Sequence, residues 1–124
     1  MKHIIILTFL ITLSSPVAAQ DFHKGLVAHN LKDYATALKE WTPLAKTGNA
    51  MAQAMLGSMY RMGEGVLQNN IIGYMWSNIA SANGYKDGAT IRDLLAKQMT
   101  PAAIEKAQAM ARECMSSKYK ECGY

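Results

Sequence analysis

The sequence predicts an all-α protein, a short solenoid of about six helices arranged as antiparallel pairs. Apolar residues recur at intervals of three and four along successive stretches, which is the spacing of one helix face. No strand-like alternation of apolar and polar residues appears beyond residue 19. Gly48 and Gly84 align the chain at a period of 36 residues, from 48 to 84. A repeat of that length indicates stacked helix pairs, because a single pair cannot bury its own apolar face.

Residues 1–19 have the organisation of a secretory signal peptide. Lys2 gives a basic start, residues 4–13 form an apolar run, and Pro16 breaks this run ahead of small residues that end at Ala19. A helix of ten residues is about 15 Å long, against roughly 30 Å of membrane hydrocarbon, so the run is too short for a membrane anchor. We expect cleavage after Ala19, no membrane span in the remaining chain, and a periplasmic or secreted protein.

The charge pattern argues against a nucleic-acid partner. The chain carries 13 Lys and Arg against 9 Asp and Glu, a net charge of +4, which falls by one if Lys2 is lost with the signal peptide. These charges are interspersed along the predicted helices, whereas a nucleic-acid surface needs a basic stripe with stacking aromatic residues. A solvated helical surface is the simplest interpretation.

The first unit is predicted to contain a short opening helix and a longer second helix. Residues 21–30 have helical spacing, and Asp33 is a good N-cap for a helix over residues 34–46. Pro43 should kink this second helix or delay its start, because proline lacks an N–H group and clashes one turn back. Gly48 favours the left-handed conformation that ends a helix.

The central unit is predicted to be a complete helical hairpin. Asn49 caps its first helix, which stops at the glycine-rich turn 63–65, because glycine tolerates the backbone angles of a tight reversal. One of the two asparagines at 69–70 caps the second helix, which ends at Gly84. Gly73 inside that helix costs about 1 kcal/mol relative to alanine, which suggests close approach to a neighbouring helix.

Two more helices are expected in the closing unit. The first covers residues 87–98, where the apolar residues share one side. Thr100 and Pro101 mark the start of the last helix, since threonine is a good N-cap and proline suits the first helical position. That helix should run to about residue 116.

The two cysteines, Cys114 and Cys122, favour one disulfide, since an even count in an exported chain indicates bonding. On one continuous helix they would lie about 12 Å apart along the axis, whereas a disulfide needs Cα atoms within roughly 7 Å. The last helix must therefore end near residues 116–118 and the tail must fold back. The small closed loop would contribute about 2.6 kcal/mol in the chain-entropy model. The alternative is two free thiols on a frayed tail.

The central unit carries small residues, a Leu-Gly pair, a tyrosine and a Gly-x-Gly turn, then a tryptophan and a closing glycine. This pattern resembles a Sel1-like repeat, a relative of the tetratricopeptide repeat. The matching positions are Ala50, Ala52, Gln53, Leu56, Gly57, Met59, Tyr60, Gly63, Gly65, Val66, Trp76 and Gly84. The resemblance implies a Sel1-like domain over 20–124, with a degenerate first repeat at 20–48, a complete repeat at 49–84 and a capping helix pair at 85–124.

Most of this motif is expected to be architecture. Small residues let two helices approach closely, the large aromatic residues fill the space between helices, and the paired glycines make the reversal. The expected structural positions are Ala52, Leu56, Gly57, Tyr60, Gly63, Gly65, Trp76 and Gly84. Four positions near the turn and the following helix depart from the family's usual residues: Leu67, Asn69, Asn70 and Gly73.

Four methionines form an arc beside that motif on the same predicted helix: Met51, Met55, Met59 and Met62. The resemblance implies that the first helix of each pair lines a concave surface. Methionines there would make an adaptable apolar surface for a protein or peptide partner. The alternative is that they pack against the first unit and belong to the core.

No catalytic, cofactor or metal site is expected. His23 and His29 are six residues apart and lie on different sides of a helix, so they do not form a two-histidine metal face. The sequence contains no nucleophile elbow, H-E-x-x-H motif or phosphate loop. The resemblance implies a non-enzymatic adaptor of the bacterial cell envelope. The alternative is a penicillin- or peptidoglycan-binding or β-lactamase-like envelope protein, although the chain lacks an S-x-x-K motif.

Overall fold

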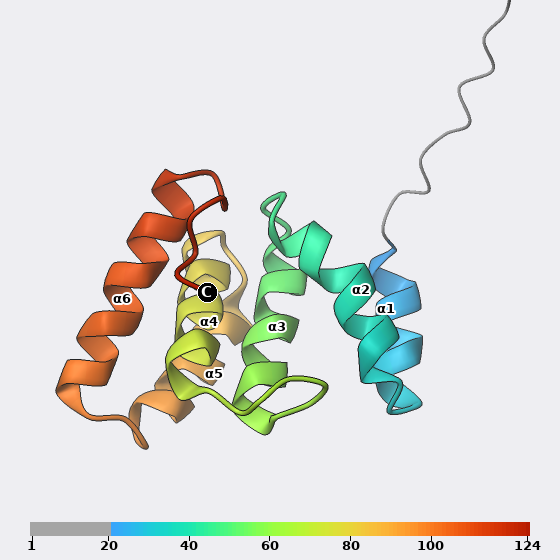
Figure 1. Ribbon diagram of the computed structural model, residues 1–124, viewed down its shortest axis with the longest axis horizontal. Coiled ribbons are helices and arrows are strands. Elements are labelled where there is room, and N and C mark those ends of the chain that lie inside the picture. Colours follow the sequence, from blue (N-terminus) through green and yellow to red (C-terminus); the bar gives the residue numbers. More distant parts are fainter. Residues whose placement is uncertain (1–20) are drawn as a thin grey trace, which may run out of the picture.

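The computed structural model describes residues 21–124 and confirms the predicted all-α fold (Figure 1). Six α-helices and no strand are present in this part of the chain. The helices are α1 Phe22–Asn30, α2 Tyr34–Ala45, α3 Ala50–Met62, α4 Asn70–Ala82, α5 Lys86–Ala96 and α6 Pro101–Ser116. The predicted signal peptide, residues 1–19, lies outside the described residues.

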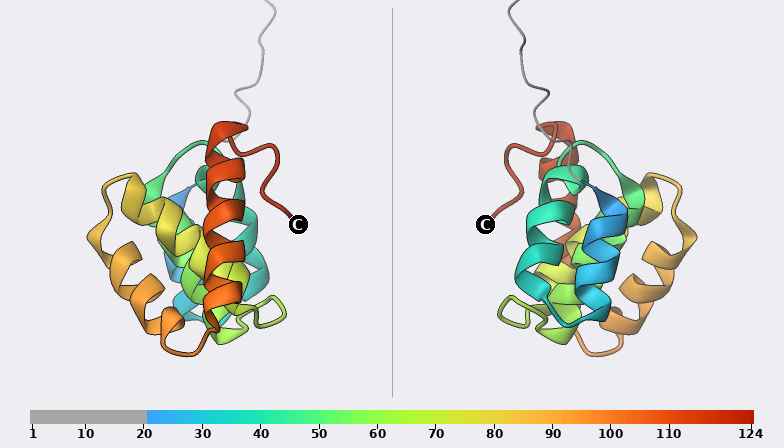
Figure 2. Two further views of the ribbon diagram at one scale, coloured as in Figure 1. Left: turned by 90° about the vertical axis from the view of Figure 1, so that its left-hand side faces the viewer. Right: turned by 90° about the vertical axis from the view of Figure 1, so that its right-hand side faces the viewer.

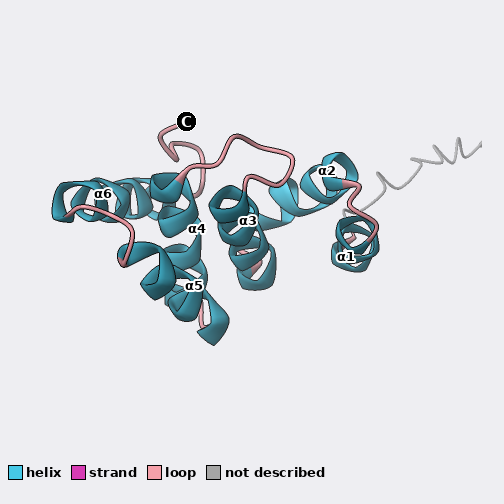
Figure 3. Cartoon of the chain, turned by 90° about the horizontal axis from the view of Figure 1, so that it is seen from below, coloured by secondary structure: helices cyan, strands magenta, loops and turns pink. Residues whose placement is uncertain are grey.

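The helices pack on their neighbours in order, with α3 and α4 at the centre. α1 packs on α2, α2 on α3, and α3 on α4, and α5 also contacts α3. Both helices of the closing unit rest on α4, and α6 shares little contact with α5. Seen end-on in Figure 3, α3 lies between α1 and α5, and Figure 2 shows the same stack from its two ends. The α3–α4 pair is therefore the support for both ends of the stack.

Helix starts follow the capping residues that the sequence offers. Asp33, Asn49, Asn69 and Thr100 each accept a hydrogen bond from a backbone N–H three residues later. These bonds satisfy N–H groups that have no partner inside the helix. Of the two asparagines at 69–70, Asn69 is the cap.

Several predicted boundaries shift by one or two residues. α4 ends at Ala82, two residues before Gly84, which adopts the positive φ of a turn. α5 covers Lys86–Ala96 where residues 87–98 were expected. Pro43 does not delay the start of α2, because it lies in the last turn of that helix. Its missing N–H leaves the carbonyl of Lys39 without a helical partner, and Lys39 is exposed, so water can bond that oxygen.

The predicted disulfide between Cys114 and Cys122 is confirmed, with Cα atoms 4.1 Å apart. α6 ends at Ser116, and Lys118 adopts a left-handed φ of 55° just beyond it. The N–H of Tyr119 donates to the carbonyl of Cys114 at 2.7 Å, which turns the chain back over the helix end. The tail therefore reverses as the spacing of the two cysteines required.

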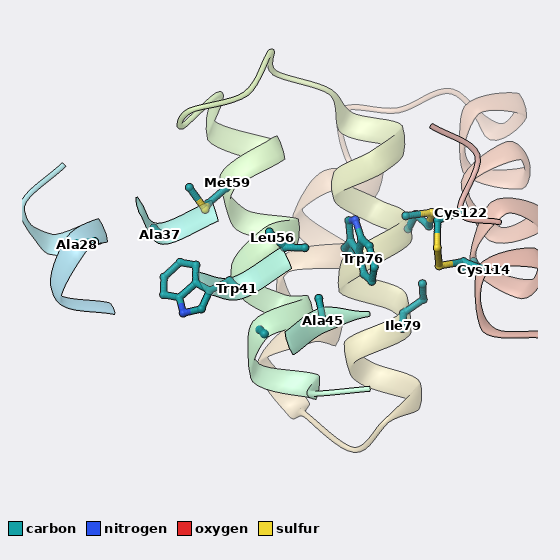
Figure 4. Close-up of a cluster of buried hydrophobic side chains, with 13 residues drawn as sticks. Ala28, Ala37, Trp41, Ala45, Leu56, Met59, Trp76, Ile79, Cys114 and Cys122 are labelled. Atoms are coloured by element: carbon teal, nitrogen blue, oxygen red, sulfur yellow. A yellow bond between two sulfur atoms is a disulfide. The ribbon is translucent and has the colours of Figure 1, made fainter. Parts of the chain in front are cut away.

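The core runs through the stack and is centred on two tryptophans (Figure 4). Trp41 of α2 donates from Nε1 to the carbonyl of Phe22 at 3.0 Å, and the two rings stack at 5.5 Å. Trp76 of α4 is fully buried among side chains of the second and third units. Gly25 leaves room for Trp41, since a Cβ there would lie 2.7 Å from its Cδ1 atom. Close packing of α1 thus depends on a residue without a side chain.

The closest helix approach joins α3 to α4 through paired glycines. A Cβ added at Gly57 would meet the Ser77 hydroxyl and lie 3.1 Å from the Gly73 carbonyl. A Cβ at Gly73 would lie 3.1 Å from the Gly57 carbonyl. The Ser77 hydroxyl donates to the Gly73 carbonyl at 2.7 Å, so this hydroxyl is hydrogen-bonded although it is buried. The close approach expected from Gly57 and Gly73 is present.

Gly57→Ala should lower the free energy of unfolding by about 1–3 kcal/mol, because the added methyl group must push α3 away from α4. Denaturant unfolding followed by circular dichroism measures the change. Ser58→Ala is the matched control, since Ser58 is the next residue, is partly exposed and should change stability by less than about 0.5 kcal/mol. Equal stability of the two variants would contradict the packing described for Gly57.

Candidate functional site

α3 presents a narrow exposed stripe on one side. Met51 is 44% exposed and Met62 is 58% exposed, while Met55 is partly buried and packs against the core. Ser58, between them, is also partly exposed. Steps of four, three and four residues join these positions, and such steps keep side chains on one side of a helix. We call this set the methionine stripe: Met51, Met55, Ser58 and Met62.

Met59 does not lie on this exposed surface, and the alternative of core packing applies to it. Its exposed fraction is 0%, and it packs in the core cluster with Ala37 and Trp41 (Figure 4). Each step of four residues turns a side chain about 40° further around an α-helix. Met59 lies two such steps beyond Met51, so its side chain points toward α2. The step of three to Met62 turns back by about 60° and returns that side chain to solvent.

The other side of α3 is fixed by packing and hydrogen bonds. Ala52, Leu56 and Gly57 are buried there. The buried side chain of Gln53 donates to the Ala45 carbonyl at 3.0 Å and accepts from Asn83 Nδ2 at 2.9 Å. This side chain therefore ties the end of α2 and the end of α4 to α3. The exposed stripe stands on a rigid support.

Exposed apolar side chains gather on the first helix of each pair. Seven large apolar side chains are exposed among residues 21–124. Five of them lie on α1, α3 and α5 or directly after α1: Val27, Leu31, Met51, Met62 and Leu94. The second helices α2, α4 and α6 carry none of this set. A binding surface formed by the first helices of the pairs would produce this asymmetry.

The only charged residue on α3 is Arg61, directly before Met62. Its Nε atom is buried and has no hydrogen-bond partner among the described residues. Arg61 also forms no ion pair within residues 21–124. A buried, unpartnered guanidinium N–H is costly, so this group can donate a hydrogen bond to a carboxylate or another acceptor. It supplies a positive charge in the same helical turn as the end of the methionine stripe.

A contact between His29 and Glu64 fastens the glycine-rich turn to the first unit. His29 Nε2 lies 3.2 Å from Glu64 Oε2, and the His29 ring lies 5.6 Å from the ring of Trp41. Glu64 lies at the tip of the turn, and its side chain is largely buried. Its carboxylate raises the pKa of the Tyr34 hydroxyl, because a hydrogen bond to a carboxylate favours the protonated phenol. The turn is thus held against α1 and α2.

Glu40 is a buried carboxylate that sequence reasoning missed. It is 5% exposed on α2, accepts the backbone N–H of Asp21 at 2.8 Å and lies 3.5 Å from Lys24 Nζ. Its burial could have been inferred from its position directly before Trp41, inside the apolar face of the helix. Glu40 holds the start of α1 on α2, so its role is structural.

Within residues 21–124, no three His, Cys, Asp or Glu side chains are grouped for a metal ion, and no pocket is present. No helix in the same range is long and apolar enough to cross a membrane.

A scan against protein-family models found no family that matches this chain, and a search of curated proteins found no similar sequence. The resemblance to Sel1-like repeats consequently rests on the residues of the central unit themselves.

Met59→Ala should destabilise the protein by about 2–5 kcal/mol, because it leaves a cavity in the core. Met62→Ala is the matched control on the same helix and should change stability by less than about 0.5 kcal/mol, since that side chain faces solvent. Thermal and denaturant unfolding of both variants measures the difference. Similar losses for the two would mean that α3 is oriented differently.

Proposed function

We propose that the protein is a non-enzymatic adaptor that binds a protein or peptide through the methionine stripe of α3. The observation that carries this proposal is the division of α3 into a fully packed side and an exposed side with methionines. Met51 and Met62 contribute little to the core, and the partly exposed Met55 and Ser58 lie between them on the same side of the helix. Exposed apolar groups of this kind often mark interaction surfaces.

The side-chain chemistry of the stripe suits an amphipathic helix of the partner. Methionine is unbranched and polarizable, so it adapts to apolar side chains of different shape. Met51, Met55 and Met62 follow the spacing of one helix face, so an amphipathic helix that lies along α3 would meet all three with its apolar side. Arg61 adds a positive charge at one end of the stripe. The partner segment should therefore present spaced apolar residues followed by a carboxylate.

The cellular setting in this proposal is the bacterial cell envelope, in the periplasm or outside the cell. The Cys114–Cys122 disulfide supports it, because disulfides persist in oxidising compartments and are rare in the cytosol. The apolar N-terminal run supports it as a cleavable signal peptide. The Sel1-like resemblance supports an adaptor role, and the concentration of exposed apolar residues on the first helices agrees with where that family would bind.

Photo-cross-linking in cells tests the proposal. A benzophenone amino acid at position 62 should give one defined protein adduct, and Met51→Glu in the same chain should reduce that adduct by about tenfold or more, since it places a charge against apolar partner groups. The matched control is the same probe at Lys106, an exposed position on α6. Circular dichroism must show that Met51→Glu leaves the fold unchanged.

Two results would contradict the proposal. One is the same adducts from positions 62 and 106, which would indicate random collision. The other is an adduct from position 62 that Met51→Glu leaves at full yield in a folded protein. Either result would remove the methionine stripe as the contact surface.

A further inference from the structure

The C-terminal tail lies as a strap across the second helix pair. Beyond α6 the chain reverses through Lys118 and Tyr119, whose φ angles of 55° and 65° are unfavourable for residues with side chains. The end of the chain then returns to the α3–α4 pair (Figure 1). Cys122 is buried in the core cluster beside Trp76 and Ile79 (Figure 4). We call residues 118–124 the strap.

Tyr124 at the end of the strap fills a subsite made by aromatic residues of α3 and α4. Its hydroxyl accepts a hydrogen bond from Trp76 Nε1 at 2.7 Å, and its ring meets the Tyr60 ring edge-on at 5.8 Å. Trp76 is fully buried, and Tyr124 is the only hydrogen-bond partner of its indole among the described residues. Although Tyr124 is 58% exposed as a whole residue, burial around its hydroxyl raises the pKa of that group. The polar end of the side chain is therefore the part that the subsite encloses.

Few other interactions hold the last four residues of the strap. Residues 121–124 form no backbone–backbone hydrogen bond. The Tyr119 hydroxyl accepts from Asn83 Nδ2 at 3.1 Å, and Glu121 N–H donates to the Ser117 hydroxyl at 2.9 Å. Gly123 lies close to Met110, since a Cβ added at this glycine would lie 2.9 Å from the methyl carbon of Met110. The position of Tyr124 thus depends chiefly on the Cys114–Cys122 bond and on its own contact with Trp76.

We propose that the strap keeps this aromatic subsite filled by Tyr124, and that reduction of the Cys114–Cys122 disulfide by a dithiol opens the subsite to the tyrosine side chain of another peptide segment. Tyr60 points about 140° around α3 from Met55, so the subsite and the methionine stripe lie on different sides of that helix. Strap release is therefore independent of the proposed function.

A dithiol supplies both electrons that reduce the Cys114–Cys122 disulfide. One thiolate of the dithiol attacks the sulfur of Cys122, which forms a mixed disulfide and releases Cys114 as a thiolate. The second thiol of the reductant then displaces Cys122 and closes the reductant's own disulfide. The protein gains two electrons and two protons, and the dithiol loses them. Cys114 is fully buried and Cys122 nearly so, so attack follows a brief opening of the strap.

Loss of the bond should shift the strap strongly toward the open state. In the chain-entropy model, the small loop closed by the two cysteines favours the closed state by roughly 80-fold, and this factor disappears on reduction. The subsite that Tyr124 vacates would offer one N–H donor, from Trp76, beside the ring of Tyr60. A phenol matches both groups, because it brings a ring and a hydroxyl oxygen that accepts.

Nuclear magnetic resonance of the ¹⁵N-labelled protein tests strap release. The two indole N–H groups give two resonances, and Tyr124→Phe identifies that of Trp76 by removing its acceptor. Full reduction with dithiothreitol, confirmed by titration of two free thiols, should shift the Trp76 resonance and speed its hydrogen exchange by tens of fold. The Trp41 indole is the internal control and should not change, since it donates to the Phe22 carbonyl far from the strap. Cys114→Ala with Cys122→Ala should reproduce the reduced spectrum without reductant.

Two outcomes of this experiment would overturn strap release. An unchanged Trp76 indole in fully reduced protein would show that side-chain contacts alone hold Tyr124. Movement of both indole resonances to the chemical shifts of unfolded protein would show that the disulfide holds the whole fold and not only the strap.

A second experiment tests which side chain the open subsite binds. N-acetyl-glycyl-tyrosine should move the Trp76 resonance of the reduced protein back toward its oxidised position and should leave the oxidised protein unchanged. N-acetyl-glycyl-phenylalanine is the matched probe and should have little effect, because it lacks the accepting hydroxyl. No response to the tyrosine probe, or equal responses to both, would overturn the assignment of a tyrosine subsite.

Discussion

The fold depends on the close contact of α3 with α4 at Gly57 and Gly73. Each glycine lies against the backbone of the other helix, and a side chain at either position would meet carbonyl or amide atoms. This approach places Trp76 beside the side chains of α3 and lets α5 reach both helices. α2 then rests on α3, and α6 rests on α4. The six helices of residues 21–124 are short, and most of them would be marginal alone, so they gain their core from this one junction.

The same junction gives α3 two different surfaces. One side is committed to packing through Leu56, Gly57 and the bonded side chain of Gln53. The opposite side carries the methionine stripe, in which Met51 and Met62 are exposed. The strap occupies a third position, where Tyr124 completes the hydrogen bonding of Trp76. The proposed recognition and the stability of the fold would thus be carried by different residues of one helix, so surface variants can be studied without loss of the fold.

Local features of this molecule, and the close approach at Gly57 and Gly73, could be predicted from the sequence, whereas the other long-range pairings could not. Caps such as Asn49 and the helix end between Cys114 and Cys122 follow from residue chemistry within one turn, and both are present. The surroundings of Met59 depend on where α2 lies, which spacing within α3 does not specify. The pairs Glu40–Asp21 and Trp76–Tyr124 join residues 19 and 48 positions apart. No local pattern encodes such distances, although a glutamate inside an apolar face and a terminal tyrosine after a cysteine were available signals.

Native-state amide hydrogen exchange tests most directly whether the α3–α4 junction supports the rest of the structure. Amides in the middle of α3 and α4, around Leu56 and Trp76, should be the slowest to exchange and should exchange with the free energy of global unfolding. Amides of α1 and α5 should open at lower free energy, since each is held from one side of the stack. Maximal protection in α6 or α1, with faster exchange around Gly57 and Gly73, would contradict the central role of this junction.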